Sequence, residues 1–162
     1  MAGEAAEAQG LEGWLRALLK ETEAGLALNT EALRRMPENA PPAAFARLWL
    51  AHIETLLHLS LYPEAANALQ SCASITKASG RVDLAGRRTY WMGVVAARTG
   101  ARERARQALR AVLAPPNHYL VAQAGLRLGQ LAADAGARSE AAGWPVQARP
   151  TPTAPDAHQP PH

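Results

Sequence analysis

The chain has 162 residues, of which 37 are Ala and 21 are Leu, while only two are Ile and one is Phe. This length and composition argue against an all-β or doubly wound fold and predict one all-α domain. The single Cys excludes a disulfide framework and a multi-cysteine zinc site. The net charge of +3 is unevenly divided: residues 1–64 carry about −4 and the remainder about +7, with eight Arg in residues 81–110.

The N-terminal segment shows no targeting or membrane signal. Its first ten residues lack a cationic start and an apolar run, and no stretch approaches the ~18 uncharged apolar residues that span a membrane. We therefore expect a flexible N-terminus over residues 1–10 of an intracellular protein, cytoplasmic or nuclear, that does not bind membranes.

The first predicted helix begins at residue 11 and has apolar residues at helical spacing. The stripe expected to pack in the core consists of Leu11, Trp14, Leu15, Leu18 and Leu19. Gly25 predicts a break, after which Asn29 or Thr30 caps a short helix that ends at Arg35.

The rest of the chain has the pattern of a string of helix pairs. Helices are predicted over residues 43–59, 63–76, 84–99, 102–113 and 119–135. A return helix is expected to start near Ala137. Gly80, Gly100 and Gly136 mark corners between helices, and Pro115 stops the helix before it.

An internal repeat accompanies these pairs. A shift of 36 residues aligns residues 93–105 with residues 129–141 and gives seven identities in thirteen positions. Four of them pair Ala in an Ala-rich chain, and the others pair Gly93 with Gly129, Gly100 with Gly136 and Arg102 with Arg138. A small residue midway along a helix lets the next helix cross close to it, and a Gly seven positions later ends the first helix.

This spacing resembles the tetratricopeptide repeat, a family of helix pairs about 34 residues long. The matching positions in residues 86–117 are Met92, Gly93, Ala96, Gly100, Ala105 and Leu109. Residues 46–77 and 122–141 match more loosely, and residues 6–39 match only near their end. The resemblance implies a solenoid of antiparallel helix pairs over residues 11–142.

In that family, the first helices of the pairs line a concave groove that holds a partner peptide. The resemblance places in this groove Arg47, Leu50, Glu54, His58, Arg87, Tyr90, Trp91, Val94, Arg98, Gln123, Arg127, Gln130 and Asp134. The predicted partner-binding residues among them are Arg87, Tyr90, Trp91, Arg98, Arg127 and Gln130. Rings and guanidinium groups dominate interface energies. The alternative is that Tyr90 and Trp91 only pack against the neighbouring pair. Leu50 and Glu54 replace the Lys and Asn of the carboxylate clamp of some members, so that mode of binding is not expected.

The last predicted pair is interrupted at Gly143. Residues 143–162 are rich in Pro and lack apolar periodicity, which predicts a disordered tail. A helix without its partner exposes its core face, here Leu120, Leu128 or Leu131, and offers a surface for self-association. We interpret the chain as a shortened form of a longer repeat protein.

No catalytic constellation emerges from the sequence. Gly125 and Gly129 lie in a helical pattern without a preceding strand and do not form a phosphate loop. His52 and His58 fall on different faces of one helix, which predicts solvated or locally hydrogen-bonded side chains rather than metal ligands. Cys72 lies among apolar residues and predicts a buried thiol. We therefore expect no enzyme activity, no cofactor and no metal.

Two classes of function remain. The first is a non-catalytic adaptor or scaffold that binds an acidic or mixed-charge segment of another protein in the groove. The alternative is a nucleic-acid-binding accessory domain that uses the Arg-rich residues 81–110. Residues 102–110 have no aromatic rings between their Arg residues, and the net charge is only +3, so the sequence favours the adaptor.

Overall fold

The structure, a computed structural model, describes residues 2–113 and 118–143, and all regular secondary structure in these ranges is helical. The prediction of an all-α fold is therefore confirmed. The helices are α1 (Ala2–Leu18), α2 (Thr22–Arg35), α3 (Pro42–His58), α4 (Tyr62–Ser71), α5 (Ala73–Ala78), α6 (Val82–Arg98), α7 (Arg102–Leu113) and α8 (His118–Gly143). None of these helices is long and apolar enough to cross a membrane. Apart from Gly143, the predicted tail lies outside the described residues.

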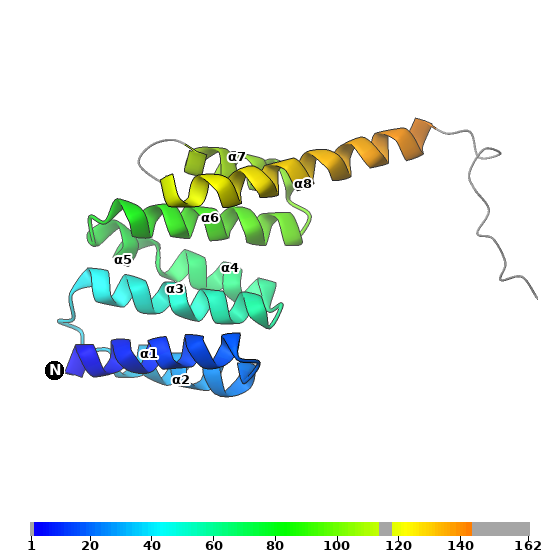
Figure 1. Ribbon diagram of the computed structural model, residues 1–162. Helices are drawn as coiled ribbons and strands as arrows, with labels where there is room; N and C mark the ends of the chain where they lie inside the picture. The colour runs from blue at the N-terminus through cyan, green and yellow to red at the C-terminus, as the bar shows by residue number, and fades with distance from the viewer. Residues whose placement is uncertain (1, 114–117, 144–162) are drawn as a thin grey trace, which may run out of the picture. The chain divides into compact units, whose positions relative to one another are not determined.

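The chain divides into two units, Met1–Leu131 and Ala132–His162, and the packing considered below belongs to the first. In Figure 1, α1, α3 and α6 lie one above another in a near layer, with α2, α4, α5 and α7 behind them. In the near layer, α1 packs on α3 and α3 packs on α6. Three clusters of buried apolar side chains, around Leu48, Ile53 and Leu109, fill the spaces between successive helices.

The packed face of α1 differs from the predicted one. Small residues, not leucines, meet the neighbouring helices, and the buried positions are Ala6, Gly10, Gly13 and Ala17. The leucines of the predicted stripe are exposed, from 44% for Leu18 to 74% for Leu19. The small side chains bring the backbones of α1 and α2 into direct contact, which a face of leucines would prevent.

Two further boundaries at the N-terminus are corrected by the structure. Residues 2–10, predicted to be flexible, form the first turns of α1. Gly25, predicted to break a helix, lies inside α2, where an added Cβ would be 2.4 Å from the carbonyl oxygen of Gly13. Gly25 therefore serves a close helix contact, and the turn itself lies at residues 19–21, where Lys20 has a φ of 70°.

The helix predicted over residues 63–76 is divided into α4 and α5 at Cys72. Side chains compete for the carbonyl oxygens near this point. The carbonyl oxygen of Leu69 accepts from Arg88 Nε at 2.8 Å and from Cys72 Sγ at 3.4 Å, and Ser71 Oγ donates to the carbonyl oxygen of Asn67. Such side-chain bonds offer the backbone an alternative to the helical ladder and bend helices. Cys72 is fully buried, as predicted.

Two of the three predicted glycine corners are confirmed. Gly80 and Gly100 have positive φ angles of 62° and 83°, and each lies just beyond the end of a helix. Gly136 is not a corner, because α8 continues through it, and the prediction of a return helix from Ala137 is wrong. A Gly costs a helix only about 1 kcal/mol relative to Ala, and the surrounding Ala residues favour the helix.

The first part of α8 is better covered than expected. Of the three leucines predicted to be partly exposed, Leu120 and Leu131 are buried in the cluster around Leu109, whereas Leu128 is only partly buried against it. The exposed apolar side chains of this segment are Val121 and Leu126.

Gly93 and Gly129 occupy equivalent places in the 36-residue repeat but differ in packing. A Cβ on Gly93 would lie 2.8 Å from Cγ of Leu109, whereas Gly129 has nothing within 4 Å. We predict that Gly93→Ala lowers the free energy of unfolding by about 1–3 kcal/mol through overpacking. Gly129→Ala is expected to raise it by about 0.5–1 kcal/mol through helix propensity. Urea denaturation followed by circular dichroism measures both, and equal effects at the two sites would contradict this packing.

A row of rings follows one side of α3. The ring centroids of Phe45 and Trp49 are 6.5 Å apart, and Trp49 meets His52 edge-on at 6.1 Å. His58 is exposed, as predicted for a solvated side chain, whereas His52 is half-buried and its Nδ1 is buried with no hydrogen-bond partner among the described residues. Burial lowers the pKa of His52 because the charged imidazolium loses solvation.

This shift makes stability depend on pH. The folded-state pKa of His52 lies below its unfolded value of about 6.5, so folding favours the neutral ring, and that contribution is lost as the pH falls below 6.5. We predict that His52→Gln reduces the loss of unfolding free energy between pH 7.5 and pH 5. The matched control is His58→Gln, at an exposed position of the same helix. Urea denaturation at both pH values tests this, and identical pH dependence of the two variants would refute it.

Candidate functional site

Five of the six predicted partner-binding residues line one hollow of about 700 Å³ in the first unit. Its lining comes from α3, α6 and the first part of α8, namely Glu54, Arg87, Tyr90, Trp91, Leu120, Gln123, Leu126, Arg127 and Gln130. These residues are far apart in sequence and are brought together because α3 and α6 lie side by side in the near layer (Figure 1).

The sixth residue, Arg98, lines an adjacent hollow of about 290 Å³. The two hollows share Glu54, Trp91 and Arg127, and together they form what is called the groove below. The second hollow adds Trp14, Leu18, Leu57, His58, Tyr62, Val94 and Arg98. The groove therefore extends to α1, which the predicted set of groove residues did not include.

A buried carboxylate lies where the two hollows meet. Glu54 accepts a hydrogen bond from Trp91 Nε1 at 3.0 Å and forms an ion pair with Arg87. A buried charge is tolerated only when it is paired and hydrogen-bonded, and both α6 donors meet that need. The charge of Arg87 is thereby neutralised within the protein, and the indole of Trp91 is held in place. Glu54 was assigned to the groove, but its role as the partner of these two residues was missed.

Tyr90 belongs to the core more than to the groove surface. It is 5% exposed, packs in the cluster around Leu109, and meets Trp91 with ring centroids 4.9 Å apart. For Tyr90, the alternative interpretation, in which the ring packs against neighbouring helices, therefore fits the structure. Leu50, also assigned to the groove, is fully buried, and that assignment is wrong.

Two guanidinium groups of the groove are not neutralised by a carboxylate in the part of the chain that is described. These are Arg98, which is exposed, and Arg127, whose Nη1 donates to Oε1 of Gln130 at 3.2 Å. Leu126, which lines the larger hollow with Arg127, is 65% exposed. The groove thus offers positive charge, an exposed apolar side chain and an amide to a ligand.

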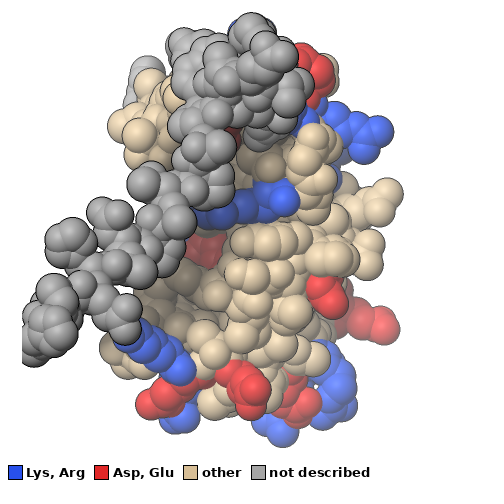
Figure 2. All heavy atoms as spheres, turned by 90° about the vertical axis from the view of Figure 1, so that its right-hand side faces the viewer, with Lys and Arg blue, Asp and Glu red and all other residues tan. Residues whose placement is uncertain are grey.

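Outside the groove, opposite charges lie next to one another. Figure 2 shows this mixture over α1 and α2, at the bottom of the view. Arg16 pairs with Glu12 at 2.8 Å and Arg34 with Glu31 at 2.7 Å, and the hydrogen bond from Arg34 holds the pKa of Glu31 well below its usual value. These exposed pairs leave little net charge on this part of the surface.

The Arg-rich segment 81–110 is partly neutralised in the same way. Arg81 pairs with Asp83 and Arg106 with Glu103, while Arg87 is held by Glu54. Three of the eight Arg residues of the segment are therefore paired with a carboxylate, whereas Arg88 donates to the neutral carbonyl of Leu69 and keeps its charge. The segment forms a weaker phosphate-binding surface than its composition indicates.

No group of three or more His, Cys, Asp or Glu residues in the described ranges is arranged to hold a metal ion. Comparison of the chain with models of known protein families, with curated protein sequences and with solved structures finds no match. The candidate site is therefore defined by its own geometry.

The pair formed by Glu54 and Arg87 should contribute to stability. The side chain of Glu54 is 10% exposed and that of Arg87 is 34% exposed, so part of the ion pair is screened by water. We predict that Glu54→Gln lowers the free energy of unfolding by about 1–3 kcal/mol, since a buried pair that loses one charge is strongly destabilised. Glu31→Gln, which breaks an exposed pair, serves as the control and should change stability little. Equal effects of the two variants in urea denaturation would contradict the role assigned to Glu54.

Proposed function

We propose that this chain is a non-catalytic interaction module, an adaptor or scaffold of tetratricopeptide-like architecture that acts in the cytoplasm or nucleus. Its groove binds an acidic or mixed-charge segment of another protein. One observation carries the proposal: side chains from α1, α3, α6 and α8 converge on one surface that presents Arg98 and Arg127 without carboxylate partners among the described residues.

The chemistry of the groove favours a peptide with both charge and apolar character. A carboxylate of the partner would pair with Arg98 or Arg127, and charge-assisted hydrogen bonds to guanidinium are among the stronger contacts in proteins. An apolar side chain would cover Leu126 and the half-buried ring of Trp91. Residues of these types supply most of the energy of interfaces, about 2 kcal/mol or more at each anchor.

The decisive test reverses the two available charges of the groove. We predict that Arg98→Glu combined with Arg127→Glu abolishes capture of the physiological partner, because a carboxylate that approaches the groove is then repelled. Neither residue forms an ion pair in the described chain, so the helical circular dichroism signal should remain. The measurement is quantitative mass spectrometry of proteins captured from nuclease-treated cell lysate.

The matched control is a second chain with Arg110→Glu and Arg102→Glu, which carries the same charge change on α7 outside both hollows. A partner retained by native and control chains and lost by the groove variant supports the proposal. Identical captured proteins for all three chains would refute it. Capture by the native chain that is seen in a parallel untreated lysate but lost in the nuclease-treated lysate favours the nucleic-acid alternative instead.

A further inference from the structure

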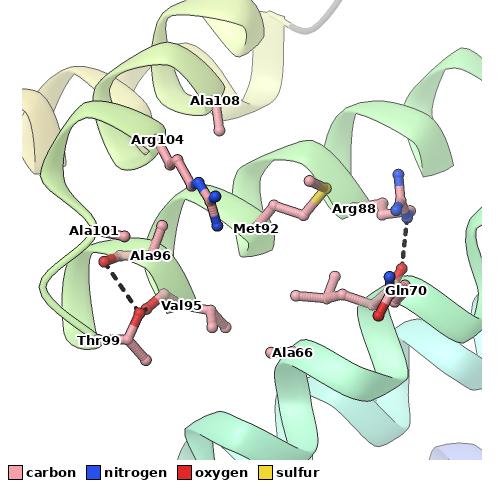
Figure 3. Close-up of a pocket in the computed structure, with 11 residues that line it drawn as sticks. Ala66, Gln70, Arg88, Met92, Val95, Ala96, Thr99, Ala101, Arg104 and Ala108 are labelled. Carbon is pink, nitrogen blue, oxygen red and sulfur yellow. Dashed lines mark hydrogen bonds between the residues drawn. The ribbon is translucent and has the colours of Figure 1, made fainter.

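A third hollow, of about 450 Å³, lies away from the groove and shares no lining residue with it. Figure 3 shows that α4, α6 and the start of α7 surround it, with Met92 between Arg88 and Arg104. This surface is called the rear hollow below. Its remaining lining is mostly apolar and includes four Ala residues: Ala66, Leu69, Gln70, Val95, Ala96, Thr99, Ala101 and Ala108.

The rear hollow exists because the residues around it are too small to fill it. Ala66 on α4 and Ala108 on α7 face the space above α6, and neither has a side chain that reaches the other helix. Both α4 and α7 pack on α6. They do not pack on each other, and every residue of both helices is described. The result is a solvent-open trough with an apolar floor, in which Met92 is 40% exposed.

Two guanidinium groups stand over this floor. Arg88 donates from Nε to the carbonyl oxygen of Leu69 at 2.8 Å, near the C-terminus of α4, where unpaired carbonyl groups attract cations. This bond fixes the position of the guanidinium and leaves its Nη groups available. Arg104 is exposed and has no ion-pair partner among the described residues. No acidic residue belongs to the described lining, so the trough is positively charged.

We propose that the rear hollow is a second protein-docking site, which binds an acidic segment of a partner through an aliphatic side chain flanked by carboxylates. The aliphatic side chain packs on Met92 and Val95, and the carboxylates pair with Arg88 and Arg104. The apolar floor is open to solvent and neither guanidinium has a carboxylate partner among the described residues, and this ligand complements both features. The trough is open along the gap between two helices, which suits a polypeptide segment better than an enclosed small molecule.

The three Met residues of the chain allow a direct test. Methyl groups of Met are labelled with ¹³C in the full chain, and the Met92 signal is assigned with Met92→Leu. The first probe is a blocked pentapeptide with Leu between two Glu residues, added to millimolar concentration. The matched peptides replace both Glu by Gln, or Leu by Ser. We expect the Met92 signal to shift with the first peptide, and the signal of buried Met36 to stay unchanged.

Two variants of α7 determine whether the rear hollow binds the peptide. Arg104→Glu should weaken binding by about tenfold or more, the loss expected for one charge-assisted contact. Arg110→Glu, an equal charge change on the same helix but outside the lining, should leave the affinity unchanged. Equal weakening by both variants, an equal response to the Gln or Ser peptide, or an unchanged Met92 signal would each overturn the proposal.

A fatty acid also combines an apolar chain with a carboxylate, so dodecanoate is added as a separate probe. A Met92 shift caused by dodecanoate but not by the Glu–Leu–Glu peptide would identify a lipid site and overturn protein docking. The groove variant with Arg98→Glu and Arg127→Glu should still bind the peptide at the rear hollow. Binding of the peptide by this variant would show that the rear hollow works independently of the groove, so the two proposals can fail separately.

Discussion

The groove depends on one buried carboxylate. Glu54 of α3 receives hydrogen bonds from Arg87 and Trp91 of α6, and these bonds link the two helices whose side chains form the middle of the groove. Burial of a charge is unfavourable unless its partners are well placed, so this contact also fixes the positions of the guanidinium and the indole. Glu54 removes the charge of Arg87 from the surface. The positive character of the groove is therefore supplied by Arg98 and Arg127.

The size of the residues between helices decides which surfaces are closed and which remain open. Where α1 and α2 meet, Gly13 and Gly25 allow backbone contact, and where α6 and α7 meet, the absent side chain of Gly93 makes room for Leu109. Alanines border the rear hollow, but there the helices on either side do not meet. Small residues thus close the packing where two helices touch directly and leave a trough where a third helix holds them apart.

The sequence predicts the helices and most of their corners, because Gly80, Gly100 and the Pro residues act on the local backbone. It does not predict which stripe of a helix packs. In α1, the leucines and the small residues both recur at helical spacing, and only the tertiary contact with Gly25 favours the small ones. Gly136 shows a related limit, since a single Gly stops a helix only where tertiary packing also turns the chain.

The candidate site was predictable in part for the same reason. Positions that follow the helical period of α6 fall on one face, so Arg87, Trp91 and Arg98 could be grouped without a structure. Burial could not be read from that period. Tyr90 follows Arg87 by three positions but packs in the core, and the pairing of Arg87 with Glu54 joins residues 33 apart in sequence.

The helix α6 explains how one segment serves two surfaces. Residues 87, 91, 94 and 98 line the groove, while residues 88, 92, 95 and 99, each one position later, line the rear hollow. One position along a helix is a rotation of about 100°, so the two sets face different sides of α6. Each set begins with an Arg that is held by another helix, Arg87 by Glu54 and Arg88 by the Leu69 carbonyl. Four of the eight Arg residues in 81–110 are therefore divided between the two surfaces, Arg87 and Arg98 in the groove and Arg88 and Arg104 in the rear hollow.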